Sequence, residues 1–370
     1  MTTSRFTRYG EQNEMDAESE VLKDTGEIIP KTPVSEVLSR TDGRFRAKRI
    51  DLAHQSRQRT FLNKYALILV WLAMALFFYF SMPTKFGRWA TVQSIFGSQE
   101  VLVFLGIAAL TTLSVGEFDL SIASIMGISA TIIPVLAGTH HLNIAIACLI
   151  AILACLASGA LNAFFVIKVG VSSLIVTLGT GTLLIGISMW ISDSSSVSIS
   201  NVAFSKVALF SIAGLPISFF YGLILVAMFA YMSLWTPVGR HMLFVGSNRE
   251  VARLAGVRVN RVRVGSYLVS SGISGLGGLL LVSTTGGFDA SGAANYLLPA
   301  LAAVFLGTAV VQPGRFNPIG TLIGIYFLET GIFGLELFGY SGWVQDVFYG
   351  AGLVAAVAIA TLVRKTISTS

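Results

Sequence analysis

Long uncharged stretches constrain the fold of this chain more than any other feature. Only 13 of its 25 Lys and Arg and 9 of its 19 Asp and Glu lie after residue 64, within 306 residues. A soluble domain has about a quarter of its residues charged, whereas this chain has 12% charged and 54% hydrophobic residues. The composition therefore argues against a soluble globular protein and against a disordered one.

The uncharged stretches have the lengths of membrane-spanning helices, for which about 20 apolar residues are needed. They cover residues 65–84, 101–116, 120–167, 169–192, 207–239, 264–288, 290–314 and 347–363, and residues 316–338 add another span despite carrying Glu329 and Glu336. The third stretch is too long for one helix and divides at the polar turn 138–141. We therefore predict an all-α polytopic membrane protein of about ten transmembrane helices. The stretches are apolar on all sides, which excludes the alternating pattern of barrel strands.

The distribution of positive charge predicts the orientation. With ten spans and a cytoplasmic N-terminus, the inside loops beyond residue 63 carry eleven Lys and Arg and the outside loops carry three. The positive-inside rule then places both termini in the cytoplasm. The loops account for the net charge of +6, so we infer no nucleic-acid binding.

Residues 1–63 differ from the rest of the chain. Residues 11–36 have a net charge of −6 and residues 40–64 a net charge of +6, with few large apolar residues to bury. We expect a disordered cytoplasmic tail over residues 1–63 and a transmembrane domain over residues 64–365. A regulatory or partner-docking role for the tail is the alternative.

Two segments share the pattern G-x-F-D-x-S, at residues 116–121 and 286–291. Five predicted spans separate them, so the two copies would face opposite sides of the membrane. This arrangement is typical of inverted repeats, whose broken helices meet near the substrate route, and it predicts two five-helix repeats. Asp119 and Asp289 would line a polar path or cap the helices that follow them.

The cytoplasmic segment 239–256 is rich in arginine. Ser247 to Glu250 has the pattern of a capping box, in which Ser247 would cap the helix and Glu250 would reach back. Gly256 would end the helix. At 100° per residue, Val251, Leu254 and Ala255 share one face, while Arg249 and Arg253 share the opposite face. So short a helix must pack against a soluble partner or lie on lipid headgroups.

This segment resembles the coupling loop of ABC-transporter permeases of the ribose and simple-sugar importer type, and the resemblance extends over residues 65–365. Residues 114–123 (S-V-G-E-F-D-L-S-I-A) are similar to the family's G-G-I-D-L-S-V-G. Residues 159–162 (G-A-L-N) and 173–180 (S-L-I-V-T-L-G-T) are similar to its G-x-x-N-G and P-F-I-x-T-L-G-T. Gly307-Thr308, residues 320–324 (G-T-L-I-G) and Gln345 match its later motifs.

The resemblance implies the membrane permease subunit of an ATP-driven, binding-protein-dependent importer of a monosaccharide or polyol in the bacterial inner membrane. It implies a permease homodimer, an extracytoplasmic sugar-binding protein, and a cytoplasmic ATPase docked on residues 240–263. ATP and Mg²⁺ would bind to that ATPase, since this chain has no Walker-type phosphate loop and would be no enzyme itself. The ATPase-coupling residues would be Ser247, Asn248, Arg249, Glu250, Ala252, Arg253 and Gly256. The translocation path would include Phe118, Asp119, Ser121, Asn162, Thr177, Phe288, Asp289 and Ser291.

Two other functions are compatible with a polytopic chain. An ion-coupled secondary transporter of a small polar solute would need intramembrane ionisable residues, for which Asp119, Asp289, Glu329 and Asp346 are candidates. A membrane scaffold is the third class. No metal-ligand spacing is present, and Cys148 and Cys155 are expected to pack on one helix face without forming a disulfide. Departures from the family pattern, such as Phe118 and Val251, leave the sugar open.

Overall fold

The computed structural model describes residues 65–368, and their side chains up to residue 358. The tail expected for residues 1–63 lies outside the described residues. In the described part, eight helical segments are long and apolar enough to cross a membrane, and two shorter apolar helices accompany them. The prediction of an all-α polytopic membrane protein with about ten spans is confirmed.

Several of the eight long segments are made of two consecutive elements. They are α4 (Trp89–Gly97) with α5 (Glu100–Leu113), α6 (Ile122–Pro134) with η1 (Val135–Thr139), α7 (Ile144–Ala163) with η2 (Phe164–Val169), α8 (Ser173–Ile191), α10 (Ile217–Trp235), α13 (Val259–Thr285), η3 (Ala290–Tyr296) with α14 (Leu297–Gly307), and α15 (Pro318–Leu337). The two shorter spans are Tyr65–Ser81 and the first part of α16 (Trp343–Ser368).

The remaining elements connect the spans. The short helices are α3 (Pro83–Phe86), α9 (Val202–Leu209), α11 (Pro237–Ser247) and α12 (Arg249–Leu254). Two antiparallel strand pairs complete the described fold: β1 (Val197–Ser198) with β4 (Gly287–Phe288), and β2 (Ser211–Ile212) with β3 (Leu215–Pro216). The β1–β4 pair joins segments that are far apart in the sequence, with Val197 opposite Phe288.

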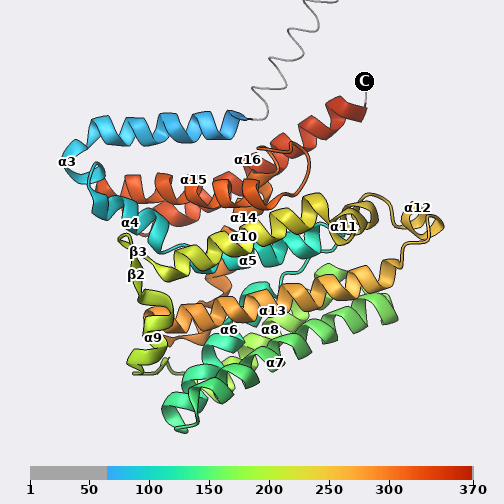
Figure 1. The fold of residues 1–370 in the computed structure, drawn as a ribbon, viewed down its shortest axis with the longest axis horizontal. Coiled ribbons are helices and arrows are strands. Elements are labelled where there is room, and N and C mark those ends of the chain that lie inside the picture. The colour runs from blue at the N-terminus through green and yellow to red at the C-terminus, as the bar shows by residue number, and fades with distance from the viewer. Residues whose placement is uncertain (1–64, 369–370) are drawn as a thin grey trace, which may run out of the picture. The chain divides into compact units, whose positions relative to one another are not determined.

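Helix α13 lies at the centre of this helical bundle and packs against α5, α6 and α7 (Figure 1). Small residues allow the close approach. A Cβ atom on Gly278 would overlap the Met126 carbonyl oxygen, and one on Gly159 would overlap the Ser271 hydroxyl. Helix α13 therefore passes between its neighbours nearly backbone to backbone.

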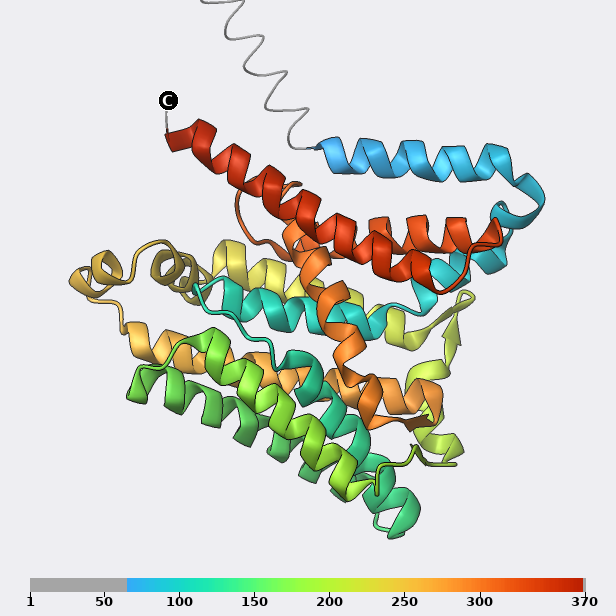
Figure 2. The ribbon, with the colours of Figure 1, turned by 180° about the vertical axis from the view of Figure 1, so that it is seen from behind.

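Helices α5 and α13 run antiparallel, as the inverted-repeat prediction requires (Figure 2). A Cβ atom on Gly277 would lie 3.4 Å from Phe104, early in α5. Further along the chain, Glu117 contacts Arg263, near the start of α13. Each of the two helices leads into one copy of the G-x-F-D-x-S segment.

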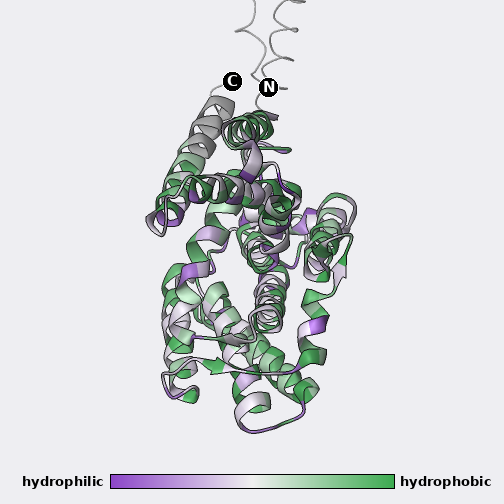
Figure 3. Cartoon of the chain, turned by 90° about the vertical axis from the view of Figure 1, so that its left-hand side faces the viewer, coloured by the Kyte–Doolittle hydropathy of each residue, from purple (hydrophilic) through white to green (hydrophobic). Residues whose placement is uncertain are grey.

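Most of the helical ribbon carries the colours of hydrophobic residues, and hydrophilic residues stand at fewer positions (Figure 3). Among the described residues, many large apolar side chains on the outer helices are exposed, including Trp190 (80%) and Phe80 (75%). So many exposed apolar side chains would promote aggregation of a soluble protein, but they are expected on a surface that faces lipid.

Candidate functional site

Helices α11 and α12 form the Arg-rich loop, and its turn differs by one residue from the prediction. Asn248, not Ser247, caps α12: its Oδ1 accepts from the backbone N–H groups of Glu250 (3.0 Å) and Val251 (3.1 Å). The Ser247 hydroxyl instead donates to the Leu243 carbonyl within α11. Either residue type can cap a helix, but α11 continues through Ser247, so the predicted assignment of the cap was wrong.

The predicted role of Glu250 in that capping box was also wrong. In that box the Glu250 carboxylate would accept from the backbone N–H of Ser247, but Ser247 lies within α11 and is not the N-cap of α12. The Glu250 carboxylate instead lies 3.6 Å from the Arg253 guanidinium on the exposed surface of α12. Gly256 ends the segment with φ +81°, a left-handed conformation suited to glycine, as predicted.

One side of α12 is buried against neighbouring helices, and its other side is exposed. Ala252 is fully buried in a small apolar cluster with Val115, Met242, Val245 and Val259. On the opposite side, Leu254 is 87% exposed and Val251 is 47% exposed. The short helix therefore presents apolar side chains outward while its own core fixes it to the start of α13.

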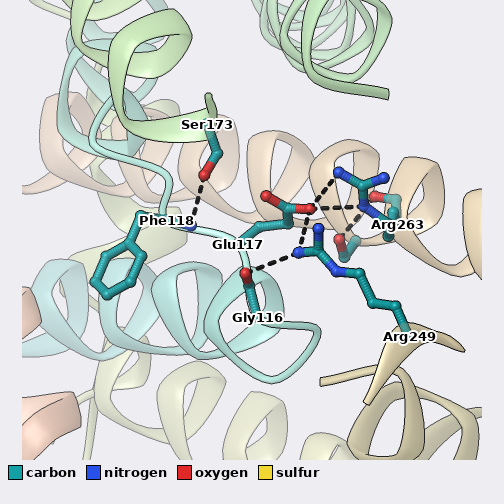
Figure 4. Close-up of polar contacts among 7 residues, drawn as sticks. Gly116, Glu117, Phe118, Ser173, Arg249 and Arg263 are labelled. Atoms are coloured by element: carbon teal, nitrogen blue, oxygen red, sulfur yellow. Dashed lines mark hydrogen bonds and ion pairs between the residues drawn. The ribbon is translucent and has the colours of Figure 1, made fainter. Parts of the chain in front are cut away.

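A buried carboxylate ties this loop to the first G-x-F-D-x-S segment (Figure 4). Glu117 is only 3% exposed. Its Oε1 accepts from the Arg249 guanidinium at 2.7 Å and from Arg263 Nε at 2.6 Å. Arg249 also donates to the Gly116 carbonyl at 2.9 Å. We call this group, Glu117 with Arg249 and Arg263, the Glu117 clamp.

The clamp shows how the loop and the transmembrane region are connected. Arg249 opens α12, Arg263 lies in the first turns of α13, and Glu117 follows α5. Charge-assisted bonds of this length are stronger than neutral ones. A displacement of α12 therefore acts directly on the segment that precedes Asp119. Glu117 was not among the predicted site residues, although an acidic residue inside an otherwise apolar region is a signal that could have identified it.

Four of the predicted path residues meet in one buried cluster next to the clamp. Asp119 Oδ1 accepts from the backbone N–H (3.0 Å) and hydroxyl (2.5 Å) of Ser121. Asn162 Nδ2 donates to the Ser121 hydroxyl at 2.8 Å. The Thr177 hydroxyl accepts from the Leu120 N–H at 3.0 Å. Asp119, Ser121, Asn162 and Thr177 are each at most 3% exposed, so this cluster holds the break between α5 and α6 together.

Phe118 stands at the edge of that cluster. Its backbone N–H donates to the Ser173 hydroxyl at 3.3 Å (Figure 4). Its side chain is 39% exposed. Of the predicted path residues in the first repeat, Phe118 thus has the most accessible side chain.

The second copy of the motif has the same local geometry in a different environment. Gly286 has φ +74°, as Gly116 has φ +75°, and Asp289 Oδ1 accepts from the N–H (2.9 Å) and hydroxyl (2.7 Å) of Ser291. These two bonds, hydroxyl first, lower the pKa of Asp289. Asp289 and Ser291 are exposed, whereas Asp119 and Ser121 are buried.

The structure does not bring the two motif copies into one site. Asp119 lies beside Ser270, in the middle of α13, with 3.5 Å between Asp119 Oδ2 and the hydroxyl. Phe288 and Asp289 follow the end of α13 and line a separate cavity. Among the described residues, no three His, Cys, Asp or Glu side chains are grouped to hold a metal ion. Cys148 and Cys155 are free thiols.

Comparison with known proteins decides the family. The model of the branched-chain amino acid transport system permease component family matches residues 91–357. The chain belongs to this family. The match covers all spans of this permease from α4 to the start of α16, the Glu117 clamp and both motif copies. The permease is a multi-pass membrane protein and a translocation subunit.

Three curated relatives of the permease come from import or transport systems. The autoinducer 2 import system permease protein LsrC of Salmonella typhi is 23% identical over 295 residues, which are 80% of this chain and 85% of LsrC. The D-allose transport system permease protein AlsC of Escherichia coli is 25% identical over 307 residues, 82% and 94% of the two chains. The ribose import permease protein RbsC of Bacillus subtilis is 29% identical over 205 residues, 54% and 62%. No solved structure matches.

Proposed function

We propose that this permease is the membrane subunit of an ATP-driven, binding-protein-dependent importer of a simple sugar, a monosaccharide or polyol. The named relatives are permease proteins for ribose, allose and autoinducer 2, which supports a sugar-like substrate. The ion-coupled alternative has no support among them. Two permease copies form the translocation unit, and an extracytoplasmic sugar-binding protein delivers the substrate.

The exposed apolar side of α12, next to the Glu117 clamp, is the observation that supports ATP-driven transport. A helix of six residues is not stable alone, and Leu254 at 87% exposure has nothing to cover it within the described residues. A cytoplasmic ATPase that covers Val251 and Leu254 would bury this side. Its movement during ATP hydrolysis would reach Glu117 through Arg249. ATP and Mg²⁺ are bound by that ATPase.

Replacing Leu254 with aspartate is expected to weaken co-purification of the ATPase subunit by about 30-fold, the size of a single hot-spot residue. Folding should be unaffected because the side chain is 87% exposed. The measurement is the amount of ATPase retained on the tagged permease, together with sugar uptake. Ile212→Asp is the matched control, since Ile212 is an exposed apolar residue of the β2–β3 hairpin. Equal retention in both variants would refute docking on α12.

Both termini are cytoplasmic in this proposal, which labelling can test. Single cysteines at His140 and Ser195 should react with an impermeant maleimide from the periplasm, and cysteines at Arg249 and Arg315 only from the cytoplasm. Cys148 and Cys155 are first replaced by alanine. Ser195 and Arg315 are both exposed, so accessibility does not limit the reaction. Periplasmic labelling at position 315 would reverse the orientation.

A further inference from the structure

A cavity of about 680 Å³ lies beyond the end of α13, away from the Arg-rich loop at its start. Its walls come from α5, the segment around β1, the end of α13, β4, η3, α14 and α16. Drug-sized ligands occupy pockets of about 300–1,000 Å³. The cavity therefore has room for a monosaccharide, and it is separate from the buried Asp119 cluster.

The cavity offers several polar groups that the fold does not use. Among the described residues, the Asn295 amide and the hydroxyls of Tyr296 and Tyr349 form no hydrogen bond with the rest of the chain. Both bonds that Asp289 accepts from Ser291 go to Oδ1, which leaves Oδ2 for a ligand. Gln345 donates to Glu336 at 3.1 Å and keeps its carbonyl oxygen. Hydrogen-bond donors and acceptors are thus both present in the lining of one cavity.

The charge of this lining discriminates between substrate classes. Of the residues that line the cavity, Asp289 alone carries a charge at neutral pH, and none is Lys or Arg. An amino acid could pair its ammonium group with Asp289, but its carboxylate would find no cationic side chain in the lining, and an unpaired charge is costly to remove from water. A neutral molecule with many hydroxyl groups needs only hydrogen bonds.

Flat apolar surfaces complete the lining. The rings of Phe288, Tyr296 and Tyr349 contribute to it, and so do the aliphatic side chains of Leu102 and Leu281. Binding pockets commonly combine such apolar surface with a few placed polar groups. The C–H face of a sugar ring suits the aromatic side, while its hydroxyls suit the amides and the carboxylate.

One wall of the cavity is held in place by the β1–β4 pair. Gly287 lies opposite Ser198, and a Cβ atom on Gly287 would lie 2.6 Å from the Val197 carbonyl oxygen. The Thr285 hydroxyl donates to the Gly287 carbonyl at 2.6 Å. The backbone around Asp289 is therefore fixed before a ligand arrives, which lowers the entropy cost of binding.

We propose that this cavity is the site where the permease receives its sugar from the outer side of the membrane, with Asp289, Asn295, Gln345 and Tyr349 as hydrogen-bonding groups. The inference rests on the proposed function and adds the location and the class of the ligand: a neutral, polyhydroxylated ring. The distance of the cavity from α12 agrees with import, because substrate and ATPase then approach opposite ends of α13.

The first test measures uptake of D-ribose and D-allose by the complete transporter in proteoliposomes. With saturating loaded binding protein, Asn295→Ala and Tyr349→Phe should each lower the uptake rate about tenfold, as expected for one lost hydrogen bond to the sugar. Ala294→Ser is the control, since Ala294 is exposed on η3 but does not line the cavity. Wild-type uptake in both cavity variants would overturn the proposal.

The second test is direct. Asn295→Cys, with Cys148 and Cys155 replaced by alanine, should react with an impermeant maleimide from outside, and millimolar D-ribose or D-allose should slow the reaction several-fold. Ala294→Cys should react equally with and without sugar, and L-leucine should protect neither position.

Unchanged labelling of Asn295→Cys, in a transporter that imports the sugar, would overturn the assignment of the sugar to this cavity but not the proposed importer function. Protection by leucine alone would overturn the ligand class. A wild-type complex that imports neither these two sugars nor any other monosaccharide or polyol of a test panel would refute the proposed function itself.

Discussion

Replacing Glu117 with glutamine is expected to abolish ATP-driven uptake while the ATPase subunit still binds. The change removes the negative charge that Arg249 and Arg263 share. Removing one partner of a buried ion pair costs about 3–5 kcal/mol. The lower value is appropriate here because Arg249 is 40% exposed, although Arg263 is only 12% exposed. A loss of about 3 kcal/mol lowers the population of molecules in which the Glu117 clamp is formed by more than 100-fold.

Three measurements on the Glu117→Gln variant separate coupling from folding. Uptake and ATP hydrolysis are measured in proteoliposomes, and co-purification of the ATPase reports docking. We expect hydrolysis without transport. Asp193→Asn is the control, because Asp193 is an exposed acid between α8 and α9 and asparagine tolerates its positive φ. Coupled uptake at the wild-type rate in Glu117→Gln would exclude the clamp from coupling.

The two motif aspartates are expected to respond differently to alanine. Asp119→Ala leaves the buried Ser121 N–H and hydroxyl without their acceptor, and such a loss costs about 1–3 kcal/mol per group. Asp289 is exposed, so Asp289→Ala loses only a solvent-exposed cap. Thermal stability of the purified permease should therefore fall clearly for Asp119→Ala and little for Asp289→Ala.

Asparagine at the same positions tests transport. Asn caps about as well as Asp, so Asp119→Asn and Asp289→Asn should both fold and both bind the ATPase. We expect each to lower sugar uptake, because a charged acceptor becomes a neutral amide. If both asparagine variants import sugar normally and only the alanine variants fail, the two aspartates are structural caps.

The spans could be predicted because they depend on local properties. A run of about 20 apolar residues forms a membrane helix whatever its partners are. About ten spans were predicted, and the described residues contain eight helical segments long enough to cross a membrane and two shorter apolar helices. The start of the second span was placed at residue 101, whereas its helical segment begins at Trp89. The polar residues Ser98 and Gln99 interrupt that segment without ending it.

The contacts between distant residues could not be predicted from one sequence. Glu117 lies 132 residues from Arg249 and 146 from Arg263 in the sequence. No local sequence pattern predicts either ion pair. The repeat did predict that Asp119 and Asp289 share a local geometry, because the same six-residue pattern favours the same turn. It did not predict that one copy is buried and the other lines a cavity, since that depends on which helices pack around each.

The length and position of α13 would turn a small rotation at one end of the helix into a larger displacement at its other end. Its 27 residues span about 40 Å at 1.5 Å per residue. Arg263 is near one end of this rod and the wall of the cavity is at the other. A tilt of roughly 5° about the clamped end would move the far end by about 3–4 Å, since an α-helix of about 40 Å transmits such a rotation with little bending. A small rotation at the clamped end would thus become a displacement on the order of a hydrogen-bond length at the far end, enough to separate a bound hydroxyl from its acceptor.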